Sequence, residues 1–178
     1  DDCQTGDLGW SANSTTDHDS DGCQDSSLED TDDDNDLVID ASDACSTGDL
    51  GWTSNATTDY DSDGCQDSSL EDTDDDNDSV QDSYDHCSKG ELGWISTPFG
   101  SDRDGDGCKD SSEDEDDDND SFLDEIDDCM HTFGNSTINA MGCIDSDGDG
   151  WTEEDSDYWL EDDFPNDPTQ WSDSDGDG

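Results

Sequence analysis

The chain has 178 residues, of which 58 are acidic and three are Lys or Arg, so its formal net charge is -55. Only 24% of the residues are hydrophobic, and ordering each residue's backbone costs about 1–2 kcal/mol, which so little apolar burial cannot offset. The charge also excludes nucleic acid as a partner, because a polyanion repels phosphate groups. The chain is therefore either disordered or held together by cross-links and bound cations.

Eight cysteines favour the second alternative. They are Cys3, Cys23, Cys45, Cys65, Cys87, Cys108, Cys129 and Cys143. They are regularly spaced and form no C-x-x-C pair or Cys/His cluster of the kind that binds zinc. This pattern predicts a series of disulfides, which persist in oxidising environments. We therefore expect an extracellular or cell-surface protein.

Other local signals are compatible with that location. Three N-x-T sequons could accept glycans. They are Asn13, Asn55 and Asn135. No hydrophobic run approaches the ~20 residues that a membrane span requires, so we expect no span in this segment. The sequence stops within a D-x-D-x-D-G motif, and we expect it to continue into further repeats.

A tandem repeat is the main signal in the sequence. The segments CQTGDLGW, CSTGDLGW and CSKGELGW begin at Cys3, Cys45 and Cys87, so the period is 42 residues. We expect three repeats and a divergent fourth unit that ends in an incomplete calcium motif. Their bounds are 1–44, 45–86, 87–128 and 129–178. No segment sustains the apolar periodicity of a helix or a strand, which predicts an irregular fold with little regular secondary structure.

Each repeat contains a first acidic loop with a calcium-binding pattern. In the third repeat, the residues from Asp102 to Glu113 match D-x-D-x-D-G-x5-E. Alternate aspartates on a tight turn aim their carboxylates at one point, and the glycine allows the sharp bend. Repeats 1 and 2 have one extra residue before the closing glutamate, which leaves the role of Glu29 and Glu71 open. The candidate ligands are Asp17, Asp19, Asp21, Asp25 and Glu29; Asp59, Asp61, Asp63, Asp67 and Glu71; and Asp102, Asp104, Asp106, Asp110 and Glu113.

A second acidic loop follows in each repeat, with aspartates at the first, third, fifth, ninth and twelfth positions of the same scheme. These candidate ligands are Asp32, Asp34, Asp36, Asp40 and Asp43; Asp74, Asp76, Asp78, Asp82 and Asp85; and Asp116, Asp118, Asp120, Asp124 and Asp127. The bend position holds Leu37, Ser79 or Ser121 instead of glycine. A frame with Asn35 at the bend is rejected, because it places apolar residues at the last two ligand positions.

The fourth unit carries two further motifs of this kind. Their candidate ligands are Asp145, Asp147, Asp149 and Glu153, and then Asp173, Asp175 and Asp177. Oxygen ligands in flexible loops favour Ca²⁺ over magnesium or a transition metal, and we expect at least about six to seven calcium sites. A merely solvated acidic surface would not keep Asp on alternate positions, in phase with Gly, from copy to copy.

The pattern D-x-D-x-D-G-x-x-D-x-x-D-x-C resembles the thrombospondin type 3 repeat, a calcium-binding module that also occurs in prokaryotic surface proteins. The resemblance is strongest from Asp32 to Cys45, from Asp74 to Cys87 and from Asp116 to Cys129. Two features depart from the family: the usual proline after this cysteine is absent, and each unit adds a GDLGW-type segment. The resemblance implies a chain wound around a row of calcium ions, as tandem repeats that form an elongated rod.

The resemblance also implies a disulfide pairing. The pairs would be Cys3–Cys23, Cys45–Cys65, Cys87–Cys108 and Cys129–Cys143. The sequence alone leaves open a shifted pairing, which begins with Cys23–Cys45 and strands the terminal cysteines. A disulfide that closes a loop of this size contributes about 3 kcal/mol in the chain-entropy model. Calcium binds only the folded loop, so its binding energy also becomes folding energy.

We therefore expect an extracellular calcium-binding structural protein and not an enzyme. It would be a stalk, a surface spacer or a filament subunit that self-associates, rigidified by Ca²⁺ and disulfides. One alternative is a calcium-dependent adhesion or matrix module that binds glycans or surface proteins through Trp10, Trp52 and Trp94. Another is a low-affinity calcium store or a mineral-binding polyanion. We expect the tryptophans to cap small apolar clusters, and His18, which aligns with Tyr60, to be a spacer.

Overall fold

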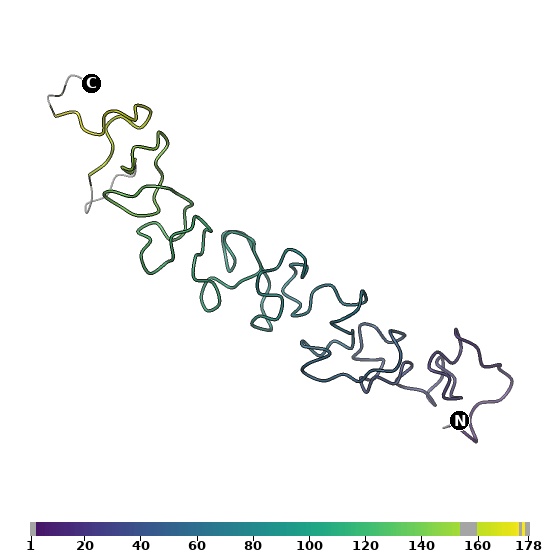
Figure 1. Ribbon diagram of the computed structural model, residues 1–178. Helices are drawn as coiled ribbons and strands as arrows, with labels where there is room; N and C mark the ends of the chain where they lie inside the picture. Colours follow the sequence, from purple (N-terminus) through teal and green to yellow (C-terminus); the bar gives the residue numbers. More distant parts are fainter. Residues whose placement is uncertain (1–2, 154–159, 175, 177–178) are drawn as a thin grey trace. The chain divides into compact units, whose positions relative to one another are not determined.

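The structure is a computed structural model that describes residues 3–153, 160–174 and 176. Within these ranges the chain forms no α-helix, no 3₁₀-helix and no β-strand, and turns and bends follow one another throughout (Figure 1). The prediction of an irregular fold with little regular secondary structure is confirmed. No helix in the described part of the chain is long and apolar enough to cross a membrane.

The chain divides into two compact units, Asp1–Trp94 and Ile95–Gly178. The first unit holds the expected repeats 1 and 2 and the opening of repeat 3. The division therefore falls inside the range 87–128, directly after the GELGW segment of that repeat. Each unit is described below by itself.

The interior is made of carboxylates and cystines instead of apolar side chains. Asp36, Asp59 and Asp102 are completely buried, with 0% of their surface exposed. In contrast, Leu8 and Leu28 are 97% and 96% exposed. This distribution inverts the usual one, in which ionised groups are almost never fully buried unless they are paired.

Disulfides fix the ends of the long loops. The pairs Cys3–Cys23 and Cys45–Cys65 each join residues 20 positions apart, and Cys129–Cys143 joins residues 14 apart. These are three of the pairs that the resemblance implies. The two remaining cysteines, Cys87 and Cys108, are also disulfide-bonded, and no cysteine is free. The bonds indicate that the protein folds in an oxidising environment.

Side-chain carboxylates hold the backbone of the acidic loops. In the first loop of repeat 2, Asp59 Oδ1 accepts the Asp63 N–H at 3.1 Å and Asp59 Oδ2 accepts the Gly64 N–H at 3.3 Å. Asp63 Oδ1 in turn accepts the Cys65 N–H at 2.9 Å. Because aspartate bonds its neighbouring backbone N–H groups in turns, these bonds take the place of a helix or sheet ladder.

The second loops make the same bend without glycine. Leu37, Ser79 and Ser121 have φ values of 81°, 84° and 82°, close to the 90° of Gly64 in a first loop. A side chain costs about 1 kcal/mol or more in this left-handed region. A charge-assisted bond opposes that cost, since the first aspartate of the loop accepts the backbone N–H of the bend residue in all three repeats. These distances are 3.1, 3.1 and 3.0 Å.

Neighbouring repeats are joined by hydrogen bonds within the first unit. The imidazole Nε2 of His18 lies 2.9 Å from the Gly48 carbonyl oxygen, and the Tyr60 hydroxyl donates to the Gly90 carbonyl at 2.9 Å. The two hydrogen bonds join equivalent pairs of positions, one 42-residue period apart. His18 and Tyr60 are therefore inter-repeat contacts, which the expectation of His18 as a spacer rather than a metal ligand did not include.

The end of repeat 1 packs directly on the first loop of repeat 2. The Ala44 N–H donates to the Asp63 carbonyl at 2.7 Å, and Asp43 lies against Gly64 so closely that a Cβ there would be 2.1 Å from Asp43 Oδ1. In the second unit, Gly142 has the same relation to Asp127, at 2.2 Å. Glycine is required at these junctions both by its positive φ and by this close approach.

Gly64→Ala and Gly51→Ala test this packing as a matched pair. Both glycines have positive φ, 90° and 85°, but a Cβ at Gly51 meets open space whereas one at Gly64 meets Asp43. We expect Gly51→Ala to lower the unfolding free energy by about 1 kcal/mol and Gly64→Ala by about 2–4 kcal/mol. Urea denaturation at saturating calcium measures both, and equal losses would contradict the Asp43–Gly64 contact.

Candidate metal centres

The first acidic loops bring their alternate aspartates together as the sequence predicts. In repeat 2, Asp59, Asp61 and Asp63 each place a carboxylate oxygen within 4.8 Å of the other two, and the equivalent triad of repeat 1 does the same. Burial, followed by repulsion from Asp63, raises the pKa of Asp61 to about 7. The loop therefore concentrates oxygen ligands where burial opposes their negative charge, and a bound cation would relieve both effects.

The second loops form the same kind of cluster. Asp32, Asp34 and Asp36 bring carboxylate oxygens within 4.8 Å of one another. One oxygen of Asp36 and one of Asp43 are enclosed without a hydrogen-bond partner in the described part of the chain. Burial is also the main cause that raises the pKa of Asp43 to about 6. These orphaned oxygens fit an oxygen-coordinated divalent cation, which would complete their coordination.

The aspartates at the ninth position close the loops by bonding the backbone. Asp25 Oδ1 accepts the His18 N–H at 3.3 Å, and its counterparts Asp67 and Asp110 accept the Tyr60 and Arg103 N–H groups at 3.0 and 2.9 Å. The second loops repeat this bond. Their ninth-position residues are Asp40, Asp82 and Asp124, with distances of 2.9, 2.9 and 3.0 Å.

In two of the predicted closing glutamates, both carboxylate oxygens accept hydrogen bonds from backbone N–H groups. Glu71 Oε1 accepts the Gln66 N–H at 3.0 Å, and Oε2 accepts the Asp49 N–H at 2.7 Å. Glu29 makes the equivalent two bonds in repeat 1, at 3.1 and 2.6 Å. Both carboxylates therefore tie the GDLGW-type segment of their own repeat to its first loop. This use accounts for the extra residue that displaces them from the expected register.

Sequence reasoning missed a further set of buried aspartates. Asp30 and Asp33 lie beside Asp25, with one oxygen of each residue within 4.8 Å of the others. The equivalent residues of the other repeats are Asp72 and Asp75, and Asp114 and Asp117. They escaped the prediction because they fall between the alternate positions that define the loops. In each of these residues one carboxylate oxygen is enclosed, and this enclosure identifies them.

The first acidic motif of the fourth unit, from Asp145 to Glu153, forms a loop like the first loops of the repeats. Asp145 accepts the Gly148 and Gly150 N–H groups, both at 2.8 Å, and Glu153 accepts the Ser146 N–H at 2.9 Å. Asp162 is an additional buried carboxylate, 3% exposed. Its N–H donates to the Thr152 carbonyl at 2.8 Å, which places it beside this loop. Burial is the main cause of its raised pKa. Of the last motif, Asp173 accepts the Gly176 N–H at 2.7 Å, whereas Asp175 and Asp177 lie outside the described residues.

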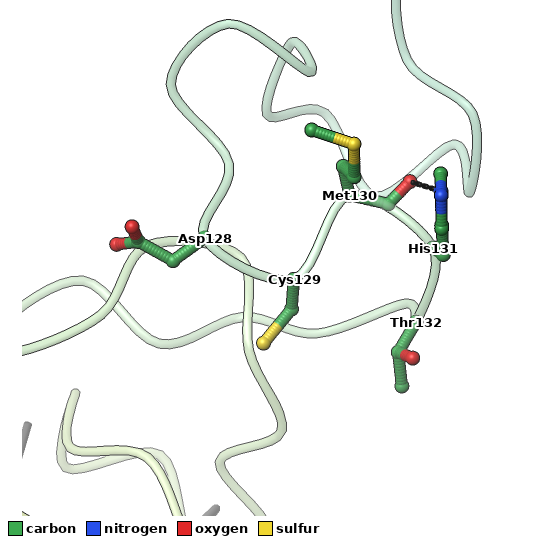
Figure 2. A pocket seen from close by; sticks show the side chains of 5 residues that line it. All are labelled: Asp128, Cys129, Met130, His131 and Thr132. Atoms are coloured by element: carbon green, nitrogen blue, oxygen red, sulfur yellow. Dashed lines mark hydrogen bonds between the residues drawn. The ribbon is translucent and has the colours of Figure 1, made fainter. Parts of the chain in front are cut away.

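A shallow pocket lies at the start of the fourth unit, lined by Asp128, Cys129, Met130, His131 and Thr132 (Figure 2). His131 Nδ1 lies 2.9 Å from the Met130 carbonyl oxygen and 3.2 Å from Asp117 Oδ2. The imidazole thus sits against one of the buried aspartates that the sequence reasoning missed.

No protein-family model matches this sequence, and no curated protein matches it either.

Glu71→Gln separates a backbone role from a ligand role. The amide nitrogen of Gln cannot accept a hydrogen bond, so one backbone N–H loses its partner, at a cost of about 1–3 kcal/mol. We expect a lower unfolding free energy in urea and an unchanged number of bound calcium ions by native mass spectrometry. Asp59→Asn, which removes a triad ligand, is the matched control and should lose one ion. Loss of an ion from Glu71→Gln would show that Glu71 is a ligand.

The raised pKa values predict opposite pH dependences with and without calcium. Burial raises the pKa of Asp33 and Asp43 to about 6 and that of Asp61 to about 7. Without calcium, the folded chain binds more protons than the unfolded chain between about pH 4 and pH 7, so its unfolding free energy should fall as the pH rises. With calcium, ions bind only ionised carboxylates, and stability should rise over the same range. Urea titrations at four pH values measure both trends; parallel trends would contradict the sites.

Proposed function

We propose that the chain is an extracellular calcium-binding protein with a structural, non-enzymatic role. The observation that carries the proposal is the recurrence of buried carboxylate triads at the same places in successive repeats, with enclosed oxygens such as Asp36 Oδ2 that lack a partner in the described part of the chain. An isolated buried carboxylate is costly, whereas a divalent cation makes the same arrangement favourable. Calcium suits these ligands because they are all oxygens on irregular backbone.

The ions would act locally and would not neutralise the chain. Six or seven calcium ions would bring only about 12–14 positive charges against a net charge of -55. The charges that they cancel are the buried ones, whose repulsion opposes folding. The remaining exposed carboxylates keep the folded surface strongly anionic, which favours solubility at the millimolar calcium concentrations typical outside cells.

The structural role follows from how neighbouring repeats connect. His18 and Tyr60 reach the next repeat through equivalent hydrogen bonds, so each repeat supports its neighbour along the chain. Repeats that contact mainly their neighbours suit a stalk, a surface spacer or a filament subunit, and we favour the filament subunit. We further propose an architecture like that of thrombospondin type 3 repeats, supported by the D-x-D-x-D-G loops and by disulfides such as Cys45–Cys65.

The tryptophans support this role over glycan adhesion. The Trp10 indole N–H donates to the Asp7 carbonyl at 3.0 Å, and Trp10 and Trp52 are only partly exposed. The Trp10 ring is therefore held against its own GDLGW-type segment, where a sugar-binding platform would present an open face.

Electron microscopy and calcium titration test the proposal. We expect native material to show fibres or extended particles that EDTA dissolves, and excess Ca²⁺ but not Mg²⁺ to restore them. Circular dichroism and thermal unfolding should shift on adding calcium, by more than 10 °C if several ions bind. Globular particles that are insensitive to EDTA would contradict the filament role, and an unchanged thermal transition would contradict calcium binding itself.

A further inference from the structure

Asp25, Asp30 and Asp33 form a third acidic cluster in repeat 1, beside its two predicted loops. Asp30 is only 7% exposed; its Oδ1 accepts the Asp32 N–H at 3.2 Å, and its enclosed Oδ2 has no hydrogen-bond partner among the described residues. Asp33 Oδ1 is enclosed and equally without a partner there. A buried, unpaired carboxylate oxygen that lies beside two other carboxylates is costly, and a bound cation would offset that cost.

The counterpart of this cluster in repeat 2 contains a cation that the chain itself supplies. Its residues are Asp67, Asp72 and Asp75, one period further on, and Asp72 and Asp75 are 7% and 6% exposed. The ammonium group of Lys89 forms ion pairs with Asp67 and, at 3.3 Å, with Asp75. These two aspartates correspond to Asp25 and Asp33 of the first cluster. Asp72 Oδ2 and Asp75 Oδ1 stay enclosed without a hydrogen-bond partner among the described residues, as their counterparts in repeat 1 do, so Lys89 compensates the charge of the cluster only through its pairs with Asp67 and with the other oxygen of Asp75.

The position of Lys89 varies from repeat to repeat. It is the second residue after Cys87, which opens repeat 3, and the corresponding residue one period earlier is Thr47, which is short and uncharged. In repeat 3 the equivalent residue is His131, whose Nδ1 lies 3.2 Å from Asp117 Oδ2. The Arg103 side chain also lies there, with its Nε 3.8 Å from Asp110 Oδ2. The Lys89 position thus carries a basic side chain at the clusters of repeats 2 and 3 and none at that of repeat 1, where His18, the counterpart of Arg103, is the basic residue.

We propose that the Asp25–Asp30–Asp33 cluster is a third calcium site of repeat 1 and that Lys89 replaces the ion in the equivalent cluster of repeat 2. This inference rests on the proposed calcium function and adds to it a rule for which repeats carry the extra ion. His18, the basic residue nearest to the first cluster in sequence, directs its ring Nε2 to the Gly48 carbonyl at 2.9 Å.

The proposed calcium site of repeat 1 and the Lys89-compensated cluster of repeat 2 should respond differently to the calcium concentration. A lysine attached to the chain cannot dissociate, so its cluster stays compensated when calcium is scarce. A calcium ion brings two charges and more ligand bonds but leaves when chelated. Repeat 1 is therefore expected to depend on calcium at its third cluster, whereas the third cluster of repeat 2 does not.

Reciprocal substitutions in the full chain test the rule by ion count. Native mass spectrometry at saturating calcium should show one ion fewer in Thr47→Lys than in the wild type, and one ion more in Lys89→Thr. Leu8, which is 97% exposed, provides the charge controls: Leu8→Lys and Leu8→Glu change the net charge by the same amounts and should leave the count unchanged.

Asp30→Asn and Asp72→Asn provide a second matched pair. Asp30 also has a carboxylate oxygen within 4.8 Å of one of Asp21 in the first loop, and Asp72 occupies the equivalent position one period later, so loss of a first-loop ligand would affect both variants alike. The proposal instead predicts that Asp30→Asn loses one ion and that Asp72→Asn loses none. Equal counts in this pair, together with unchanged counts in Thr47→Lys and Lys89→Thr, overturn the inference while calcium binding stands. A wild-type chain that binds no calcium overturns both the inference and the proposed function.

Discussion

Burial of carboxylates is the constraint on which the rest of this structure depends. Asp36, Asp59 and Asp102 are fully enclosed in a chain whose leucines lie largely in solvent. Removing an ionised group from water is costly unless an opposite charge or several hydrogen bonds compensate it. Backbone N–H groups supply part of that compensation. The enclosed oxygens that remain without a partner in the described residues mark where bound cations would supply the rest.

The same aspartates therefore have two roles. One oxygen of a carboxylate commonly accepts a backbone N–H and shapes the turn, as Asp43 Oδ1 does for Cys45, while the second oxygen stays available to an ion. Folding and ion binding are in this way coupled through single side chains. A loop without its ion keeps some of its hydrogen bonds but must bear the repulsion among its charges, which is why the effect of pH should change sign with calcium.

The sequence predicted those features that rest on local spacing. The loops with aspartates on alternate positions, such as Asp59 to Asp63, follow from the turn itself, and the absence of helices and strands within the described ranges follows from the lack of apolar periodicity. The bend at Leu37 was also placed correctly, although glycine is missing there.

Features that depend on contacts between distant segments were not predictable in the same way. Glu71 looks like a late loop ligand in sequence, yet its second oxygen reaches Asp49, 22 residues earlier. His18 and Tyr60 differ in chemistry but make the same bond, because only the position of a polar atom matters to the carbonyl that they reach. Asp30 and Asp33 lie out of phase with the loop pattern, and only the folded chain shows that they are buried together.

The disulfides also set how far this chain can be stretched. In a 42-residue repeat, the Cys45–Cys65 bond joins residues 20 positions apart and removes the chain between them from the path that a pulling force follows. At about 3.4 Å for each extended residue, roughly 70 Å of contour length stays locked in each such loop. A repeat that unfolds under load can thus yield only about half of its full length before a covalent bond bears the force. A reducing environment would release the other half.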